Sequence, residues 1–300
     1  MMNFPRTAVV CAALLFSVVQ SANAQDAPRV VTDILPVHSL VAQIMEGVGA
    51  PDLLLEAGSD PHNYAMRPSQ ASLLENADVV IVIGPALTPW LEKPLATLAN
   101  GATQVILLEV LGTELLEYRG GHDHGHGHGH DDENVDPHAW LDPKNAKVWL
   151  SSIADTLAQN DPANSALYLA NAETARAELT NLEAEWQAAL DGVGRYGVHH
   201  DAYQYFEARF GLATGFVIKE DDAHQPGPAR IAELRADIAQ NAVACVFVEP
   251  FVNRGLIETV LEGSDAKILE LDQMGVNFEP GPDLFSLVLR EMVASVAQCR

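Results

Sequence analysis

Short runs of apolar, β-branched residues alternate with longer helical patterns along most of the chain. Strands that alternate with helices in this way form parallel sheets covered by helices. The pattern therefore predicts an α/β protein of two lobes, each a roughly four-stranded parallel sheet with flanking helices. The expected strands are residues 30–35, 52–56, 79–83 and 105–108 in the first lobe and residues 196–199, 214–218, 243–248 and 267–271 in the second.

One long helix is expected to join the two lobes, over residues 161–190. Asp161 and Pro162 are typical of a helix start, and Asp191 with Gly192 is typical of a helix end. At 1.5 Å per residue such a helix is about 45 Å long, which is most of the diameter of a small domain. We therefore expect a stiff connection between the lobes.

The first 24 residues have the pattern of a secretory signal. Arg6 precedes an apolar stretch at residues 8–19, and Ala22-Asn23-Ala24 is a small-x-small cleavage site. A membrane anchor is the alternative, but a spanning helix needs about 20 apolar residues and this run is shorter. We expect cleavage after Ala24 and an exported protein. The predicted domains are a signal peptide at residues 1–24, an N-terminal lobe at 25–159, a linking helix at 160–191 and a C-terminal lobe at 192–300.

Composition and charge narrow the choice of partners. The 300-residue chain is 48% hydrophobic and carries a formal net charge of -24. Such a charge argues against nucleic acid and anionic membrane surfaces as partners, and it concentrates cations around the protein. An acidic surface that serves only solubility is an equally simple explanation. The charge therefore agrees with a cation-binding function without requiring one.

Two cysteines, Cys245 and Cys299, are left once Cys11 is removed with the signal. Export places them in an oxidising compartment, where disulfides form and persist. We predict that they pair, which would connect the strand at residues 243–248 to the last helix. The alternative is two buried free thiols.

Residues 120–134 differ in composition from everything around them. Histidines alternate there with Gly and Asp, and no apolar residue is present to hold the segment to a core. We expect a mobile loop whose imidazoles are auxiliary metal ligands that raise the local metal concentration. A dispensable, solvated insertion is the alternative. The histidines are His122, His124, His126, His128 and His130.

Four further residues are expected at or just after strand ends, where open α/β folds place ligand sites. One of them lies in a rigid segment flanked by Pro137 and Pro143. Two belong to each predicted lobe, so an ion that they share would lie between the lobes. Three imidazoles and a carboxylate complete the tetrahedral shell that Zn²⁺ prefers. Their spacing matches no local zinc motif, so hydrogen-bonded loop histidines are the alternative. The four are His62, His138, His200 and Asp272.

Motifs around these positions extend over essentially the whole mature chain. They are Asp60-Pro61-His62-Asn63-Tyr64 with Arg67-Pro68-Ser69, Asn76-Ala77-Asp78, Asp136-Pro137-His138-Ala139-Trp140-Leu141, His200-Asp201-Ala202-Tyr203, Gln225-Pro226-Gly227 and Val248-Glu249-Pro250. Together they resemble the high-affinity zinc-uptake solute-binding proteins of ABC importers, the ZnuA type. The resemblance implies two α/β lobes joined by a long helix and a disulfide between the two remaining cysteines. It also implies ligand roles for the three histidines, and a His-rich, acidic loop in this interval is typical of zinc members.

The fourth ligand is where the sequence departs from the family. Some zinc members have a Glu immediately before the first histidine, whereas this chain has Pro61, which offers no ligand atom. Asp272 or a water molecule must then complete the shell, and we predict Asp272. Glu249 is the nearest other carboxylate, and Asp142 and Asp201 are candidates to orient the imidazoles or are simply turn residues.

The identity of the third histidine bears on metal choice. Manganese-type members tend to have a carboxylate at the position of His200, so an imidazole there favours zinc. His199 is its neighbour and rival. Because strand neighbours point to opposite faces, we expect only one of them to face the cleft, and the family motif favours His200.

The expected function is therefore capture of Zn²⁺ as cargo in the periplasm and its delivery to an ABC permease in the inner membrane. The protein is expected to act as a monomer, with a periplasmic zinc chaperone as a further candidate partner, and not as an enzyme. Alternatives are a manganese or other divalent-metal carrier of the same fold, a metallochaperone or adhesin with a structural metal, and a zinc-dependent hydrolase. The sequence has no HExxH or GxSxG motif, which argues against the hydrolase.

Overall fold

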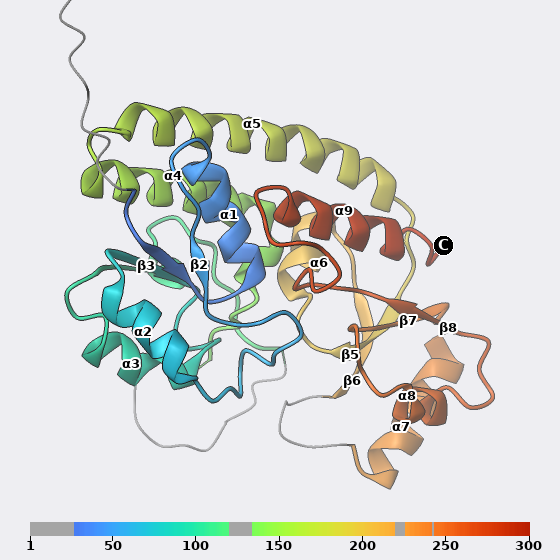
Figure 1. The fold of residues 1–300 in the computed structure, drawn as a ribbon. Helices are drawn as coiled ribbons and strands as arrows, with labels where there is room; N and C mark the ends of the chain where they lie inside the picture. The colour runs from blue at the N-terminus through green and yellow to red at the C-terminus, as the bar shows by residue number, and fades with distance from the viewer. Residues whose placement is uncertain (1–26, 120–133, 220–225, 242) are drawn as a thin grey trace, which may run out of the picture.

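The computed structural model describes residues 27–119, 134–219, 226–241 and 243–300. Within these ranges the chain forms two four-stranded parallel sheets with helices packed against them (Figure 1). The strand order is β2-β1-β3-β4 in the first sheet and β6-β5-β7-β8 in the second. The predicted α/β class with two parallel sheets is confirmed. The predicted signal peptide and the histidines of the predicted loop lie outside the described residues.

The strands of the first sheet lie near the predicted apolar runs; β1, β2 and β3 are shorter than predicted, and β4 begins and ends two residues earlier. The first strand ends at Thr32 because Leu35 and Pro36 begin a helix, in which proline is tolerated in the first turn. The strands are β1 (Val30–Thr32), β2 (Asp52–Leu53), β3 (Val79–Val82) and β4 (Thr103–Ile106). The helices are α1 (Leu35–Met45), α2 (Pro68–Asn76), α3 (Glu92–Thr97) and α4 (Pro143–Asn160), with short 3₁₀ turns η1 (Pro89–Leu91), η2 (Leu107–Glu109) and η3 (Ala139–Leu141).

The second sheet repeats the plan and has a glycine at its centre. A Cβ built on Gly197 would lie only 2.2 Å from Cζ of Phe216 on the neighbouring strand, so a larger residue there would force the Phe216 ring to move. The strands are β5 (Tyr196–His200), β6 (Thr214–Lys219), β7 (Cys245–Val248) and β8 (Lys267–Glu270). The helices are α6 (Gln204–Phe210), α7 (Pro228–Asn241), α8 (Arg254–Val260) and α9 (Leu284–Val296).

The predicted long helix is α5 (Ser165–Leu190), and it begins four residues later than expected. Asp161 ends α4 instead, and its carboxylate accepts hydrogen bonds from Asn164 and Tyr168 in the turn between the two helices. Figure 1 shows α5 running across both sheets, where it packs against α1, α4 and α9. The helix α9 also contacts α1, so two helices connect the units in space.

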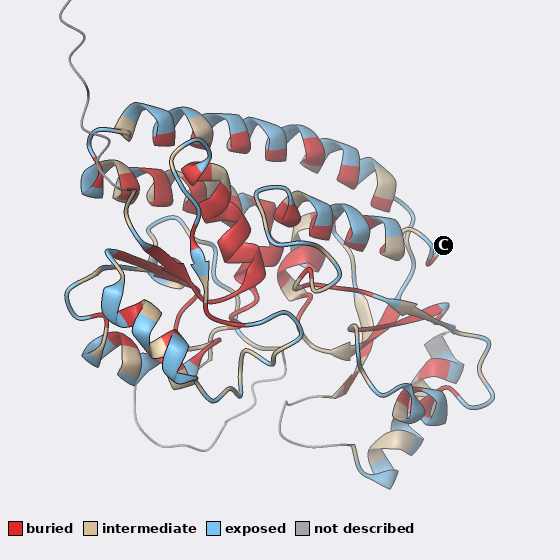
Figure 2. Cartoon of the chain, in the orientation of Figure 1, coloured by how far each residue is buried: buried red, intermediate tan, exposed pale blue. Residues whose placement is uncertain are grey.

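The core is continuous between the two units (Figure 2). One apolar cluster extends from Val30 in the first sheet through Trp149 and Trp186 on the central helices to Phe247 in the second sheet, and all four side chains are buried. Burial of apolar surface on this scale is the main force that holds such an assembly together. No helix in the described ranges is long and apolar enough to cross a membrane.

The predicted disulfide is confirmed. Cys245 and Cys299 are bonded, both are buried, and their Cα atoms are 5.7 Å apart, which is usual for a disulfide. The bond connects the start of β7 to the end of the chain beyond α9. It therefore holds the last helix to the second sheet.

Candidate metal centre

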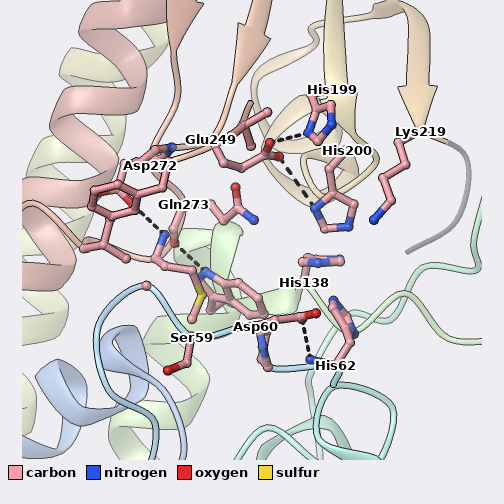
Figure 3. A pocket seen from close by; sticks show the side chains of 18 residues that line it. Ser59, Asp60, His62, His138, His199, His200, Lys219, Glu249, Asp272 and Gln273 are labelled. Carbon is pink, nitrogen blue, oxygen red and sulfur yellow. Dashed lines mark hydrogen bonds and ion pairs between the residues drawn. The ribbon is translucent and has the colours of Figure 1, made fainter. Parts of the chain in front are cut away.

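Three of the predicted ligands converge in the structure (Figure 3). His62, His138 and His200 each offer one ring nitrogen, and these atoms all lie within 4.8 Å of one another. The ring centroids are 5.0 to 6.0 Å apart. Nitrogen ligands of a tetrahedral zinc, at bonds of about 2.0–2.1 Å, are about 3.4 Å apart. Side-chain movements on the order of 1 Å therefore bring the three nitrogens to the spacing that one ion needs.

The same local device presents the first two histidines. In each Asp-Pro-His segment the carboxylate accepts a hydrogen bond from the backbone N–H of the histidine two residues later, from His62 to Asp60 at 2.9 Å and from His138 to Asp136 at 3.0 Å. Such Asx turns fix the backbone of a loop without a helix or strand. Trp90 adds a bond from its indole N–H to the carbonyl of Pro61. The loop after β2 is thereby held in place.

His138 is almost fully buried, and its ring is oriented by a buried carboxylate. Oδ1 of Asp136 lies 2.7 Å from Nδ1 of His138, and both residues are 2% exposed. When Nδ1 carries the proton and donates it to Asp136, Nε2 is left as an acceptor for a metal. Asp136 therefore has the role that sequence analysis considered for Asp142 and Asp201.

The structure pairs those two acids with arginines instead. Asp142 accepts two hydrogen bonds from Arg209, and Asp201 accepts one from Arg119. Each of these pairs joins a residue of the first unit to one of the second. Their contribution is therefore to hold the two units together beside the site.

His200 is the last residue of β5, and its partner is Glu249. Oε1 of Glu249 lies 3.6 Å from Nδ1 of His200, and Oε2 lies 2.8 Å from Nδ1 of His199. Burial alone would raise the pKa of Glu249, but the hydrogen bonds and positive charge offered by His199 and His200 outweigh it and hold the pKa below its ordinary value. Glu249 thus remains a carboxylate that orients both rings.

The expectation that only one of these two histidines faces the cleft was wrong. His199 and His200 both line the same pocket, because the strand ends at His200 and Glu249 holds both rings at this end. His199 nevertheless lies outside the group of three whose nitrogens converge. The geometry favours His200 over its neighbour, as the motif does.

Asp272 lines the pocket but is engaged elsewhere. Its Oδ1 accepts backbone N–H bonds from Met274 and Gly275, and Oδ2 accepts one from Asn277 at 3.2 Å. It is buried, and it is not among the three residues that converge. Its role as the fourth ligand stays a prediction.

The pocket that these residues line encloses about 250 Å³ between the two units. One wall comes from the loop after β2 and from His138 and Trp140, and the other comes from the ends of the strands of the second sheet. Sequence reasoning missed Gln273, Lys219 and Phe251 on its walls. Nothing in the local sequence signals them, because they reach the pocket only through packing of the second unit. The volume is suitable for an ion with a few water molecules.

Comparison with known proteins decides the family. The family model described as "ZnuA: Zinc-uptake complex component A periplasmic" matches residues 30–299. The chain belongs to the ZnuA family. The high-affinity zinc uptake system protein ZnuA of Paracoccus denitrificans is 39% identical over 98% of this chain and 98% of that protein. The high-affinity zinc uptake system protein ZnuA of Brucella abortus is 35% identical over 90% of this chain and 91% of that protein.

Solved structures show the ZnuA-type fold. A crystal structure of ZnuA covers 91% of this chain and 99% of its own, with a TM-score of 0.77 and 24% identity. The structure of the solute-binding protein FpvC of Pseudomonas aeruginosa in complex with Mn²⁺ matches over 91% of this chain and 98% of that chain, with a TM-score of 0.79 and 23% identity. At these identities the likeness establishes the fold alone. The resemblance that the motifs predict is confirmed by the family match.

Proposed function

We propose that this protein is the periplasmic zinc-binding component of an ABC importer, which captures Zn²⁺ in the pocket between the two sheets and delivers it to a membrane permease. The observation that carries the proposal is the convergence of three imidazoles from both units in a chain of the ZnuA family. Imidazole is a preferred zinc ligand, and the net charge of -24 concentrates cations around the protein. The family is a transport component, so a hydrolase is not favoured.

The proposed ligands are His62, His138 and His200, with Asp272 in the fourth position. Oδ2 of Asp272 accepts one backbone N–H, so a lone pair remains for a metal. A water molecule is the alternative. A site with three imidazole ligands favours zinc over manganese, because imidazole suits zinc and manganese prefers carboxylate and water oxygens.

Titration of the purified protein against a competing zinc chelator tests the proposal. Substitution of any one of the three histidines by Ala should weaken tight zinc binding strongly, because each removes one ligand from the first coordination sphere. His38→Gln is a matched control, since His38 is buried in α1, where its Nε2 lies 3.1 Å from the carbonyl of Pro51. Unchanged tight binding in all three ligand variants, or preference for manganese over zinc in direct competition, would contradict the proposal.

A structural metal predicts a different outcome in thermal melting. A carrier must be folded without its cargo, whereas a structural site makes the fold depend on the ion. We expect the protein to melt cooperatively in the presence of a chelator and at a higher temperature when zinc is added. Loss of the cooperative transition in chelator would favour the structural role.

Partners and auxiliary residues complete the proposal. The uptake system implies a permease and an ATPase in the membrane, and we infer a monomeric carrier that a periplasmic zinc chaperone also loads. The signal at residues 1–24 directs it to the periplasm. Deletion of residues 121–132 should remove the weak sites of the predicted loop and leave the tight site unchanged.

A further inference from the structure

The histidine-rich insertion begins and ends on a short paired segment that the structure describes. We call residues 116–119 and 134–136 the stem. Glu117 pairs with Val135 in an antiparallel bridge. On either side of this bridge, N–H of Tyr118 donates to the carbonyl of Asn134 at 3.0 Å, and N–H of Asp136 donates to that of Leu116 at 2.9 Å. The two halves of the stem are therefore hydrogen-bonded to each other through their own backbones, and these bonds do not involve the histidines between them.

One side of the stem is bonded to the helix that follows His200 in the second unit. The hydroxyl of Tyr205, on α6, accepts from N–H of Leu116 and donates to the carbonyl of Asp136, both at 2.8 Å. The side-chain amide of Gln204 donates to the carbonyl of Glu117 at 2.8 Å and to Oδ2 of Asp136 at 3.2 Å. Both halves of the stem are thus held by the start of α6.

Arg119, the last described residue before the insertion, adds two ion pairs to this contact. Its guanidinium donates to Oδ1 of Asp201 and to Oε2 of Glu207, each at 2.6 Å. Glu207 is 4% exposed at its side chain, so its charge requires a partner. Asp201 directly follows His200, the last residue of β5. The ion pair with Arg119 therefore fixes the chain next to His200.

The other side of the stem reaches His138. Asp136 is the last stem residue, and its Oδ1 holds both the backbone N–H and the ring of His138. One continuous set of bonds therefore connects His138, through the stem and α6, to the end of β5 at His200. These two imidazoles come from different units, yet no more than a few hydrogen-bonded groups separate them.

From this geometry we propose that the stem positions His138 relative to His200, and that Arg119 is the positioning residue that fixes their spacing for one ion. The proposal rests on the proposed zinc site and gives the stem a role that does not depend on the histidines of the insertion. In the described part of the chain, the side-chain bonds of Arg119 go to Asp201 and Glu207 and not to a proposed ligand. Arg119 acts through Asp201 and Glu207, and its planar guanidinium reaches both carboxylates at once, which a lysine cannot do equally well.

The experiment measures zinc affinity by chelator competition in Arg119→Gln and Arg119→Lys. Partners that orient metal ligands from outside typically change affinity about 10- to 100-fold, and we expect about a ten-fold loss for Gln, the low end, with partial recovery for Lys. Arg235→Gln is the matched control, because Arg235 pairs with Glu262 on the exposed surface away from the pocket. That control should bind zinc as the native protein does.

A second readout separates positioning from general destabilisation. The visible absorption of the Co²⁺-loaded protein reports the coordination geometry, and it should change in Arg119→Gln and recover in part in Arg119→Lys. A role in stability alone would lower Tm and leave the Co²⁺ spectrum unchanged. Should Arg119→Gln fail to fold by circular dichroism, Asp201→Asn removes one of the two pairs and leaves Glu207 compensated.

The insertion itself is tested separately. We expect a chain in which a Gly-Ser linker replaces residues 120–133, with the stem intact, to keep the tight site. Adding Arg119→Gln to it should cause the same loss as in the full chain. Native affinity and spectrum in Arg119→Gln, or a loss that disappears with the insertion, would overturn the proposal. Persistence of tight binding in His138→Ala would instead refute the zinc site, so the two failures are distinguishable.

Discussion

Removal of the disulfide should cost this protein a large part of its stability. Cys245 and Cys299 are separated by 54 residues. In the chain-entropy description, closing a loop of this size lowers the entropy of the unfolded chain by about 14 cal/mol/K, which is about 4 kcal/mol at 25 °C. Small domains have a free energy of unfolding of about 5–15 kcal/mol, so this is a substantial fraction. We expect the variant Cys245→Ala with Cys299→Ala to be less stable by about this amount.

Urea denaturation of the zinc-free protein, followed by circular dichroism and tryptophan fluorescence, measures the effect. The midpoint should fall, and the native protein treated with a reductant should show a similar fall. Neither cysteine lines the pocket, so zinc affinity of the folded variant should match that of the native protein. If the free energy of unfolding of the double variant were within about 1 kcal/mol of that of the native protein, the loop-entropy reasoning would be refuted.

Two further predictions concern buried carboxylates. Asp136→Asn should weaken zinc binding by about 10- to 100-fold in chelator competition, because the ring of His138 loses its charged acceptor. Burial raises the pKa of Asp33 to about 7, although hydrogen bonds from backbone N–H groups, among them those of Ile83 and Ile34, oppose the rise. The folded state therefore holds this proton more tightly than the unfolded state, and the stability it contributes is present below pH 4 and is lost as the pH rises to about 7. The loss amounts to about 4 kcal/mol and should be absent in Asp33→Asn, as urea denaturation across this pH range would show.

Each of these has a clear negative outcome. Native zinc affinity in Asp136→Asn would mean that the ring of His138 is held by packing alone. Parallel pH profiles of the native protein and Asp33→Asn would mean that Asp33 titrates in its ordinary range in the folded state.

The local sequence was sufficient for the elements and for the three histidines that converge. Apolar periodicity is a local property, so it located the strands of both sheets and the long helix. The errors are at the ends of elements, such as the late start of α5 at Ser165. The pairing of Cys245 with Cys299 followed from export and from the number of cysteines. His62, His138 and His200 stood out because motifs surround them. These features depend on neighbouring residues or on the number of cysteines, so they can be inferred without the tertiary structure.

The distant partners of the site were decided only by the tertiary structure. Glu249 lies 49 residues after His200 in the sequence (249 - 200), and Arg119 lies 82 residues before Asp201. Sequence analysis left Asp142 and Asp201 open as acids that orient the imidazoles or as turn residues, and both bind arginines of the opposite unit. Hydrogen bonds and ion pairs act over about 3 Å, and which groups come that close depends on how whole helices and sheets pack. For that reason the local sequence identifies the imidazoles and the Asp-Pro-His contacts of His62 and His138, whereas packing chooses Glu249 as the carboxylate that holds His200.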